Sequence, residues 1–157
     1  MKVELVNYTS DAVDLLLFTK NTRLMDDDDA YGKIAGWSET KKQEELDYML
    51  QTIRSSWEFI DYTFNIRDVS RGFTHQFVRT RQASYAQQSQ RTVDMFGFSY
   101  YTPERIEQNH EALEEYDKAM ADIADAYQRL RKFVPAEDAR GVLPTNIHPN
   151  IVAKFNL

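Results

Sequence analysis

The sequence predicts a single domain of the mixed α/β (α+β) class over residues 1–157. Hydrophobic residues make up 42% of the chain and aromatic residues 13%. A compact domain of this length buries roughly 70% of the surface that its unfolded chain exposes, so a real hydrophobic core can form. The spacing of apolar residues follows two different patterns along the chain. Some segments alternate apolar and polar residues, which is typical of strands, and others have apolar residues three and four apart, which is typical of amphipathic helices. The combination predicts helices packed on a sheet.

The N-terminal third begins with a predicted strand at residues 3–6 and a helix over residues 10–24. Ser10 is a suitable N-cap for this helix. Four consecutive acids follow at residues 26–29, and two glycines lie shortly after them. Because like charges repel and glycine interrupts regular structure, we expect a solvated loop over residues 25–37. A calcium site is the alternative for the acids, although their spacing is not that of an EF-hand.

A second helix is predicted over residues 38–56, with Ser38 as its N-cap. Its apolar residues recur at helical spacing. They are Leu46, Met49, Leu50 and Ile53.

The middle of the chain shows strand and helix patterns in turn. Apolar and polar residues alternate over residues 57–66, which predicts a strand with one apolar face. Residues 68–78 are predicted to turn back as a helix that brings Phe73 and Phe77 inward. Residues 95–101 are a second candidate strand.

The C-terminal part is dominated by one long predicted helix. Thr102 would cap it, Pro103 would occupy its first position, and Pro135 would end it. Its apolar stripe, at spacings of three and four, would form core or subunit contact. The stripe consists of Ile106, Leu113, Tyr116, Met120, Ile123, Tyr127 and Leu130. After residue 135 we expect a short helix, a turn and an apolar segment at residues 151–155.

Composition excludes several classes of function. A net charge of −6 and a pI near 5.1 argue against general affinity for nucleic acid. The absence of cysteine excludes disulfides, thiolate metal sites and sulfur nucleophiles. The three histidines, His75, His110 and His148, have no metal-binding spacing, so we predict no metal site.

The sequence also lacks signals for a membrane. No apolar run approaches the roughly 20 residues that span a bilayer, and the N-terminus lacks a signal-peptide pattern. We therefore expect a cytoplasmic protein without membrane contact.

One segment has an unusual chemistry. Residues 79–91, RTRQASYAQQSQR, contain three arginines, two serines and four glutamines, but no acid. The planar guanidinium of arginine can bind phosphate through two parallel hydrogen bonds, and serine hydroxyls can complete such a site. The segment therefore indicates a local anion site, with phosphate as its ligand. The alternative is a structural role in which the arginines pair with Asp94 or with the acids at 26–29.

The same segment resembles the signature of flavin-dependent thymidylate synthases, R-H-R-x-x-S-x-x-x-x-S-x-R. Three further segments resemble the family in the same order along the chain: SSWEFIDYTF, HQFVR and EDARGVLPTN. Together they cover most of residues 55–156. The signature positions are matched by Arg79, Arg81, Ser84, Ser89 and Arg91.

The resemblance implies a fold and a set of site residues. The fold would be that of the thymidylate synthase-complementing proteins, a twisted, mainly antiparallel sheet flanked by helices. Arg79 and Arg81 would act electrostatically in catalysis, without an enzyme nucleophile. The FAD-binding residues would be Ser55, Glu58, Arg79, Thr80, Arg81, Gln87 and Asn156. The residues that bind the substrate dUMP would be Gln76, Arg79, Gln87, Ser89, Gln90, Arg91 and Arg140.

The resemblance also implies a reaction and an assembly. A one-carbon unit would pass from methylenetetrahydrofolate to carbon 5 of dUMP to give dTMP, and NADPH would reduce the flavin. The enzyme would be a methyltransferase that works as a homotetramer with shared active sites, in the cytoplasm, or in the host cytoplasm if the protein is viral. The absence of cysteine agrees with this route, since the folate-only thymidylate synthases attack the base with a thiolate.

The chain departs from the family pattern at several positions. Thr80 replaces the central histidine of the signature, Gln87 replaces a glutamate, and Ile53 and Phe59 replace upstream histidines. The family's C-terminal segment beyond Asn156 is expected to be missing from this chain.

These departures leave three alternative functions open: a non-catalytic nucleotide- or flavin-binding homologue, a pyrimidine-nucleotide hydroxymethylase, or a helical assembly protein on the same scaffold.

Overall fold

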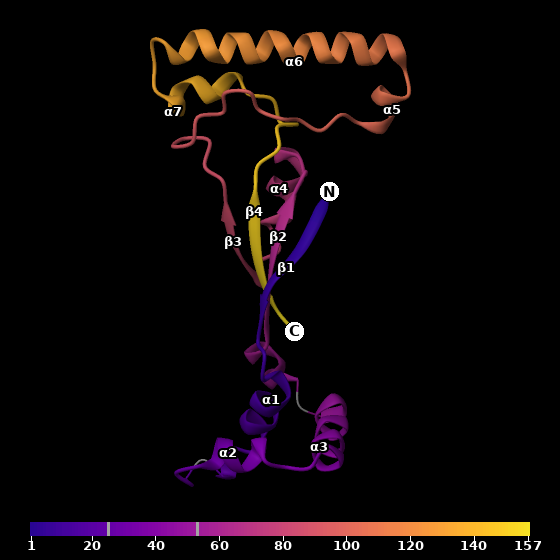
Figure 1. Ribbon diagram of the computed structural model, residues 1–157, viewed down its shortest axis with the longest axis vertical. Helices are drawn as coiled ribbons and strands as arrows, with labels where there is room; N and C mark the ends of the chain where they lie inside the picture. The colour runs from indigo at the N-terminus through magenta and orange to yellow at the C-terminus, as the bar shows by residue number, and fades with distance from the viewer. Residues whose placement is uncertain (25, 53) are drawn as a thin grey trace. The chain divides into compact units, whose positions relative to one another are not determined.

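The protein contains a four-stranded antiparallel sheet in the strand order β1-β2-β4-β3 (Figure 1). The computed structural model describes residues 1–24, 26–52 and 54–157. The last strand in the chain lies between the second and third, so distant parts of the sequence are paired in the sheet. The strands are β1 Lys2–Tyr8, β2 Asp61–Arg67, β3 Ala83–Gln87 and β4 Ile151–Asn156. The mixed fold class and the antiparallel sheet predicted above are confirmed.

The helices vary widely in length. None of those in the described part of the chain is long and apolar enough to cross a membrane. The α-helices are α1 Ala12–Lys20, α2 Ala30–Ala35, α3 Glu39–Thr52, α4 Arg71–Phe77, α5 Glu104–Glu107, α6 His110–Arg131 and α7 Ala136–Ala139. Short 3-10 segments occur at Thr22–Leu24, Ser55–Phe59 and Arg140–Val142.

The chain divides into two compact units, each with its own core. Unit 1 comprises residues 1–4 and 65–153, and unit 2 comprises residues 5–64 and 154–157.

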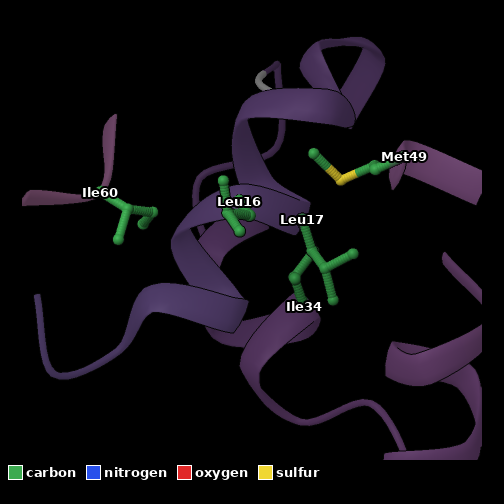
Figure 2. Packing of buried hydrophobic residues seen from close by; sticks show 5 residues of the cluster. All are labelled: Leu16, Leu17, Ile34, Met49 and Ile60. Atoms are coloured by element: carbon green, nitrogen blue, oxygen red, sulfur yellow. The ribbon is translucent and has the colours of Figure 1, made fainter. Parts of the chain in front are cut away.

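The core of unit 2 is formed by apolar side chains from α1, α2 and α3 and by Ile60, the residue before β2 (Figure 2). Leu17, Ile34 and Met49 are completely buried. Burial of such a side chain contributes about 1.5–3 kcal/mol relative to leaving it exposed. An ion pair of 2.6 Å between Lys42 and Asp14 adds a link between α3 and α1. These contacts explain why this acid-rich part of the chain folds.

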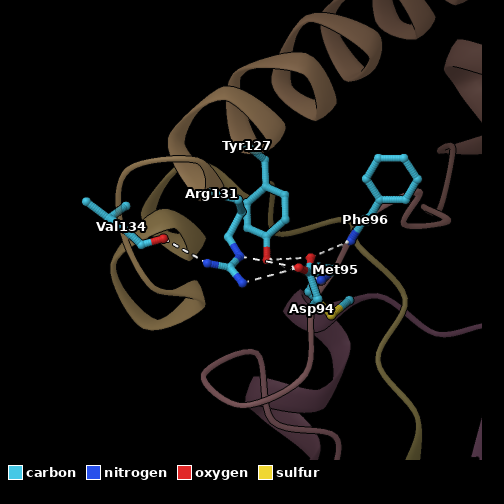
Figure 3. Close-up of polar contacts among 6 residues, drawn as sticks. All are labelled: Asp94, Met95, Phe96, Tyr127, Arg131 and Val134. Carbon is cyan, nitrogen blue, oxygen red and sulfur yellow. Dashed lines mark hydrogen bonds and ion pairs between the residues drawn. The ribbon is translucent and has the colours of Figure 1, made fainter.

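The core of unit 1 is built against α6. Met95, Tyr127, Ala139 and Ile147 form a buried cluster. Asp94 binds the same helix through polar contacts: its carboxylate accepts hydrogen bonds from the Tyr127 hydroxyl, at 3.2 Å, and from the Arg131 guanidinium, at 3.3 Å (Figure 3). The Tyr127 oxygen in turn accepts from the Met95 amide at 3.2 Å. The loop after residue 91 is thereby fixed to α6.

Several predicted boundaries in unit 2 are wrong. Asp11, not Ser10, is the residue before α1, and its side chain makes no capping hydrogen bond. The loop expected over residues 25–37 contains α2, because burial of Ala30 and Ile34 stabilises a helical turn beside the acids. Residues 57–59 belong to a 3-10 segment, so the predicted strand begins only at Asp61.

The helix predicted over residues 38–56 is α3. Ser38 is confirmed as its cap, since its Oγ accepts from the Lys41 amide at 3.3 Å. Met49 is buried as expected, whereas Leu50 is 58% exposed. Ile53 lies outside the described residues.

Unit 1 also departs from the sequence pattern. Residues 95–101 are not a strand: Gly97 has a φ of +65°, which ends any extended run, and Tyr100 makes one isolated bridge to Ile147. The long helix starts at His110, where the Asn109 side chain accepts from the Ala112 amide, and α5 is a separate turn after Pro103. Thr102 is therefore not the cap.

The inward placement of Phe73 is also wrong. Phe73 is 39% exposed, and the buried residue of α4 is Thr74. The ring of Phe73 instead stacks on that of Phe77, with 5.2 Å between centroids.

We expect Tyr127→Phe to lower the free energy of unfolding by about 1–3 kcal/mol, because the buried Met95 amide loses its acceptor. Urea unfolding measures the change. Tyr8→Phe is the control, since Tyr8 is 56% exposed and its loss of a hydroxyl should change stability by less than about 0.5 kcal/mol. Equal stability of Tyr127→Phe and the wild type would contradict the role given to this hydroxyl.

Candidate functional site

The arginine-rich segment 79–91 lies between α4 and β4 in unit 1 and includes the whole of β3. Its geometry begins with α4. The Ser70 side chain caps this helix by accepting from the Phe73 amide at 3.1 Å. The Arg71 and Gly72 amides donate to the carbonyls of Ile147 and Thr145, each at 2.9 Å. The first turn of α4 is thus fixed to the chain that leads into β4.

The turn that carries Arg79, Thr80 and Arg81 is held by Tyr85 of β3. The Tyr85 hydroxyl lies 3.0 Å from both the Phe77 carbonyl oxygen and the Thr80 carbonyl oxygen, so its proton is shared between them. The Tyr85 ring meets the Phe77 ring edge to face, with 5.2 Å between centroids. Because the backbone is held on both sides, the turn presents the side chains of residues 79–81 to solvent from a defined position.

The far end of β3 is held by two amide side chains. Gln87 donates from Nε2 to the hydroxyl of Thr74 at 2.7 Å. The Gln88 amide N–H donates to the Asn150 carbonyl at 2.9 Å, and the Gln88 side-chain oxygen accepts from the Asn150 amide at 3.2 Å. The segment therefore leaves β3 at a fixed place, just before Ser89.

Residues 89–91 form a turn with features of an anion cradle. The Ser89 Oγ accepts from the Arg91 amide at 3.1 Å. The side-chain nitrogen of Gln90 is buried and has no hydrogen-bond partner among the described residues. A buried polar group without a partner costs about 1–3 kcal/mol, so an acceptor on a bound ligand would relieve this cost.

Two further arginines meet at α7. Arg91 forms an ion pair with the Glu137 carboxylate, and the Arg140 Nε donates to the Glu137 carbonyl at 3.1 Å. In the alternative structural role, the arginines of the segment would pair with Asp94; Asp94 instead binds Arg131, and Arg91 binds Glu137. Arg91 and Glu137 are both about half exposed, and an exposed ion pair is worth about 0–1 kcal/mol. Breaking this ion pair therefore costs little free energy.

The predicted site residues divide between the two units. Ser55 and Glu58 lie in the 3-10 segment of unit 2, where Ser55 lines a cavity of about 300 Å³ together with Leu15, Phe18 and Phe59. Asn156 is the last residue of β4 and also falls in unit 2. Unit 1 carries the others, namely Gln76, Arg79, Thr80, Arg81, Gln87, Ser89, Gln90, Arg91 and Arg140.

Of the three histidines, His75 lies on α4, where its Nε2 accepts from the Arg71 Nε at 3.1 Å. His110 is exposed and lies 3.5 Å from Glu114, and His148 Nδ1 lies 3.3 Å from the Ser99 hydroxyl. Burial lowers the pKa of His148 below its usual value. No group of three or more acids or histidines in the described ranges could hold a metal ion.

Sequence reasoning missed the residues that position the segment. Tyr85, Thr74 and Asn150 were not singled out, although all three hold β3 or the turn before it. The only signal in the sequence is Tyr85 itself, an aromatic residue with a polar tip inside an otherwise polar stretch. Their partners are backbone carbonyls and side chains from distant segments, which periodicity does not reveal.

The chain belongs to the thymidylate synthase complementing protein family, whose model matches residues 4–157. A relative from Sulfolobus acidocaldarius, named flavin-dependent thymidylate synthase, is 36% identical over 169 residues, which cover 99% of this chain and 60% of the relative. A relative of the same name from Nitratidesulfovibrio vulgaris is 39% identical over 108 residues, 63% of this chain and 44% of the relative. The chain thus spans about 60% of the length of the Sulfolobus protein.

A solved structure shares the fold. The UMP/dUMP methylase PolB from Streptomyces cacaoi, bound with 5-Br dUMP, superposes with a TM-score of 0.72 at 19% identity, over 99% of this chain and 73% of that one. The expected fold family is confirmed by this match together with the family model.

We expect Glu137→Gln to strengthen binding of inorganic phosphate by up to about fivefold, because Arg91 is released from its competing carboxylate. Isothermal titration calorimetry measures the affinity. Glu115→Gln, an exposed glutamate on α6, is the matched control for the change in net charge. Weaker binding by Glu137→Gln than by this control would show that Glu137 supports the site instead of competing with the ligand.

Proposed function

We propose that residues 1–157 act as one flavin-dependent thymidylate synthase-like domain, a methyltransferase that uses FAD and makes dTMP from dUMP. The observation that carries the proposal is the acid-free segment 79–91, which contains β3 and exposes its arginines, and in which the buried side-chain nitrogen of Gln90 has no partner among the described residues. Membership in the family and the names of its relatives support the reaction class. The absence of cysteine supports a route without a thiolate.

The residues fit a nucleotide phosphate in the turn at 89–91. Ser89, Gln90 and Arg91 would hold the phosphate and sugar of dUMP, with Gln76, Arg79, Gln87 and Arg140 as further contacts. The Ser89 hydroxyl accepts from the Arg91 amide and keeps its own proton for a ligand oxygen. Arginine donates to phosphate in pairs, which fixes the orientation of the nucleotide as well as its affinity.

The residues also fit a flavin. The cavity beside Ser55 has apolar walls from Leu15, Phe18 and Phe59, on which an aromatic ring system can pack. Its other lining residues carry hydroxyl groups, namely Thr19, Thr22, Ser55 and Ser56. Glu58 and Asn156, which belong to the same unit, would add polar contacts there. Thr80, Arg81 and Gln87 of unit 1 are proposed as FAD contacts on the resemblance to the family alone. When bound, FAD would supply hydride to the transferred carbon after reduction by NADPH, and methylenetetrahydrofolate would supply the carbon.

Arg79 and Arg81 would stabilise charge during the reaction. Carbon 5 of the pyrimidine becomes nucleophilic only as negative charge develops on the ring, and that charge spreads to the carbonyl oxygens. A fixed guanidinium near these oxygens lowers the energy of the charged state. The hydroxyl of Tyr85 fixes the turn that carries both arginines, so these cations need not reorganise during the reaction.

We further propose that the protein self-associates, as a homotetramer with shared sites, in the cytoplasm. Every residue of β1 is exposed, and Val3, Leu5, Val6 and Tyr8 leave about half of their surface open. Exposed apolar residues on an edge strand are typical of a surface that a partner covers. The net charge of −6 does not favour nucleic acid as that partner.

The visible spectrum of the purified protein with FAD tests the proposal. We expect a bound flavin that is bleached by anaerobic NADPH and reoxidised only when dUMP and methylenetetrahydrofolate are both present, with tritium released from dUMP labelled at carbon 5. Arg81→Ala should lower the turnover rate about 100- to 1000-fold, whereas Arg129→Ala on α6 should leave it unchanged. Retained flavin and dUMP binding without turnover would indicate the non-catalytic homologue, and a hydroxymethylated product would indicate the variant transferase.

A further inference from the structure

The arginines of segment 79–91 lie on two turns, one at each end of β3. Residues 78–82 form the turn before the strand and carry Arg79 and Arg81, and residues 88–91 follow the strand and carry Arg91. Since β3 has five residues, its two ends are about 15 Å apart. The strand between the turns is paired with β4 in the sheet.

The turn before β3 is held by the Tyr85 side chain. The Tyr85 hydroxyl lies 3.0 Å from the carbonyl oxygens of both Phe77 and Thr80. A carbonyl oxygen cannot donate, so the hydroxyl is the donor in both contacts. The Thr80 amide also donates to the Phe77 carbonyl at 3.1 Å and closes the turn. Removal of the hydroxyl therefore loosens residues 78–82.

The turn after β3 is held by a reciprocal contact between Gln88 and Asn150. The Gln88 amide donates to the Asn150 carbonyl at 2.9 Å. The Gln88 Oε1 accepts from the backbone amide and from the side-chain amide of Asn150, each at 3.2 Å. Because a backbone amide can only donate, the oxygen of the Gln88 side chain must face it. Ser89 therefore follows a backbone position that this contact fixes.

The two sets of hydrogen bonds share no residue. Tyr85 binds the end of α4 and the turn that follows it, whereas Gln88 binds the residue that precedes β4. Contacts without shared partners that lie more than about 7–10 Å apart usually contribute additively to stability. Loss of one set is therefore expected to leave the other in place.

We propose that Tyr85 and Gln88 are positioning residues with separate tasks. Tyr85 holds the turn whose arginines stabilise charge on the reacting ring, and Gln88 holds the turn that binds the phosphate. These tasks rest on the proposed function, which gives charge stabilisation to Arg79 and Arg81 and phosphate binding to residues 89–91. Turnover rate and phosphate affinity can then be lost one at a time.

Two variants separate the tasks. Tyr85→Phe removes the hydroxyl but keeps the ring that meets the Phe77 ring. Gln88→Leu removes the side-chain acceptor but keeps the backbone hydrogen bond to Asn150.

Matched controls come from elsewhere in unit 1. The Tyr116 hydroxyl also donates to a backbone carbonyl, that of Tyr101, at 2.9 Å, so Tyr116→Phe makes the same chemical change away from the segment. Gln108 is an exposed glutamine at the end of α5, and Gln108→Leu is the control for the second variant.

Amide hydrogen exchange tests the two attachments without any need for activity. We expect Tyr85→Phe to speed exchange of residues 78–82 about fivefold and to leave residues 88–91 within about twofold of the wild type. Gln88→Leu should do the reverse, and neither control should change either turn. Faster exchange of both turns in either variant, or unchanged exchange of residues 78–82 in Tyr85→Phe, would overturn the proposal.

Turnover and ligand affinity then test the tasks. At saturating dUMP, tritium release should fall about tenfold in Tyr85→Phe, because loosened arginines must reorganise in the transition state. The ratio of dUMP affinity to deoxyuridine affinity should stay within about twofold of the wild type in this variant and fall about fivefold in Gln88→Leu. Rate and ratio that fall together in both variants would overturn the separate tasks.

Failure of the enzyme and failure of these tasks give different results. A wild type without turnover would reject the proposed enzyme and the task given to Tyr85, while the affinity ratio of Gln88→Leu still tests the phosphate turn. Turnover in the wild type, with rate and affinity ratio lost together in both variants, would support the enzyme and overturn the separate tasks. A wild type that binds deoxyuridine as tightly as dUMP would overturn the task given to Gln88.

Discussion

The candidate site depends on the attachment of β3 to α4. The hydroxyl of Tyr85 holds the turn that follows the helix, and the contact between Gln87 and Thr74 holds the other end of the strand. Thr74 is buried, and Phe77, Tyr85 and Gln87 are half-buried, so the hydrogen bonds among these residues are poorly replaced by water when they are lost. Exposed arginines have long flexible side chains. A fixed backbone limits the positions that their guanidinium groups can reach, so that these groups can bind one ligand together.

The two units contribute different chemistry to the proposed function. Unit 1 carries a cluster of cationic and hydroxyl groups suited to phosphate, and the Asp94 network holds the following loop on α6 (Figure 3). Unit 2 carries an apolar cavity beside Ser55 and a compact core of its own (Figure 2). An acidic protein can bind an anion in this way because the positive charge is local, and the acids lie elsewhere in the sequence.

Much of the fold could be predicted from the sequence wherever one periodicity or one cap dominates. The alternation before Arg67 marks β2, and Ser38 caps α3 as its side chain suggests. Prediction failed where a distant contact decides the local structure. The aromatic residues at 95–101 resemble a strand, but Gly97 and the burial of Met95 against α6 make that stretch a loop. The composition of residues 79–91 is enough to predict an anion site. The hydrogen bonds of Tyr85 and Thr74 that hold the segment cannot be predicted in this way, because they join residues that come together only in the folded chain.

The central claim is that residues 79–91 form a phosphate site, and a comparison of dUMP with deoxyuridine by isothermal titration calorimetry tests it most directly. The two ligands share base and sugar and differ only in the phosphate. Because charge-assisted hydrogen bonds contribute about 1.5–3 kcal/mol each, we predict that dUMP binds at least about tenfold more tightly than deoxyuridine. Equal affinities for the two ligands would contradict the account.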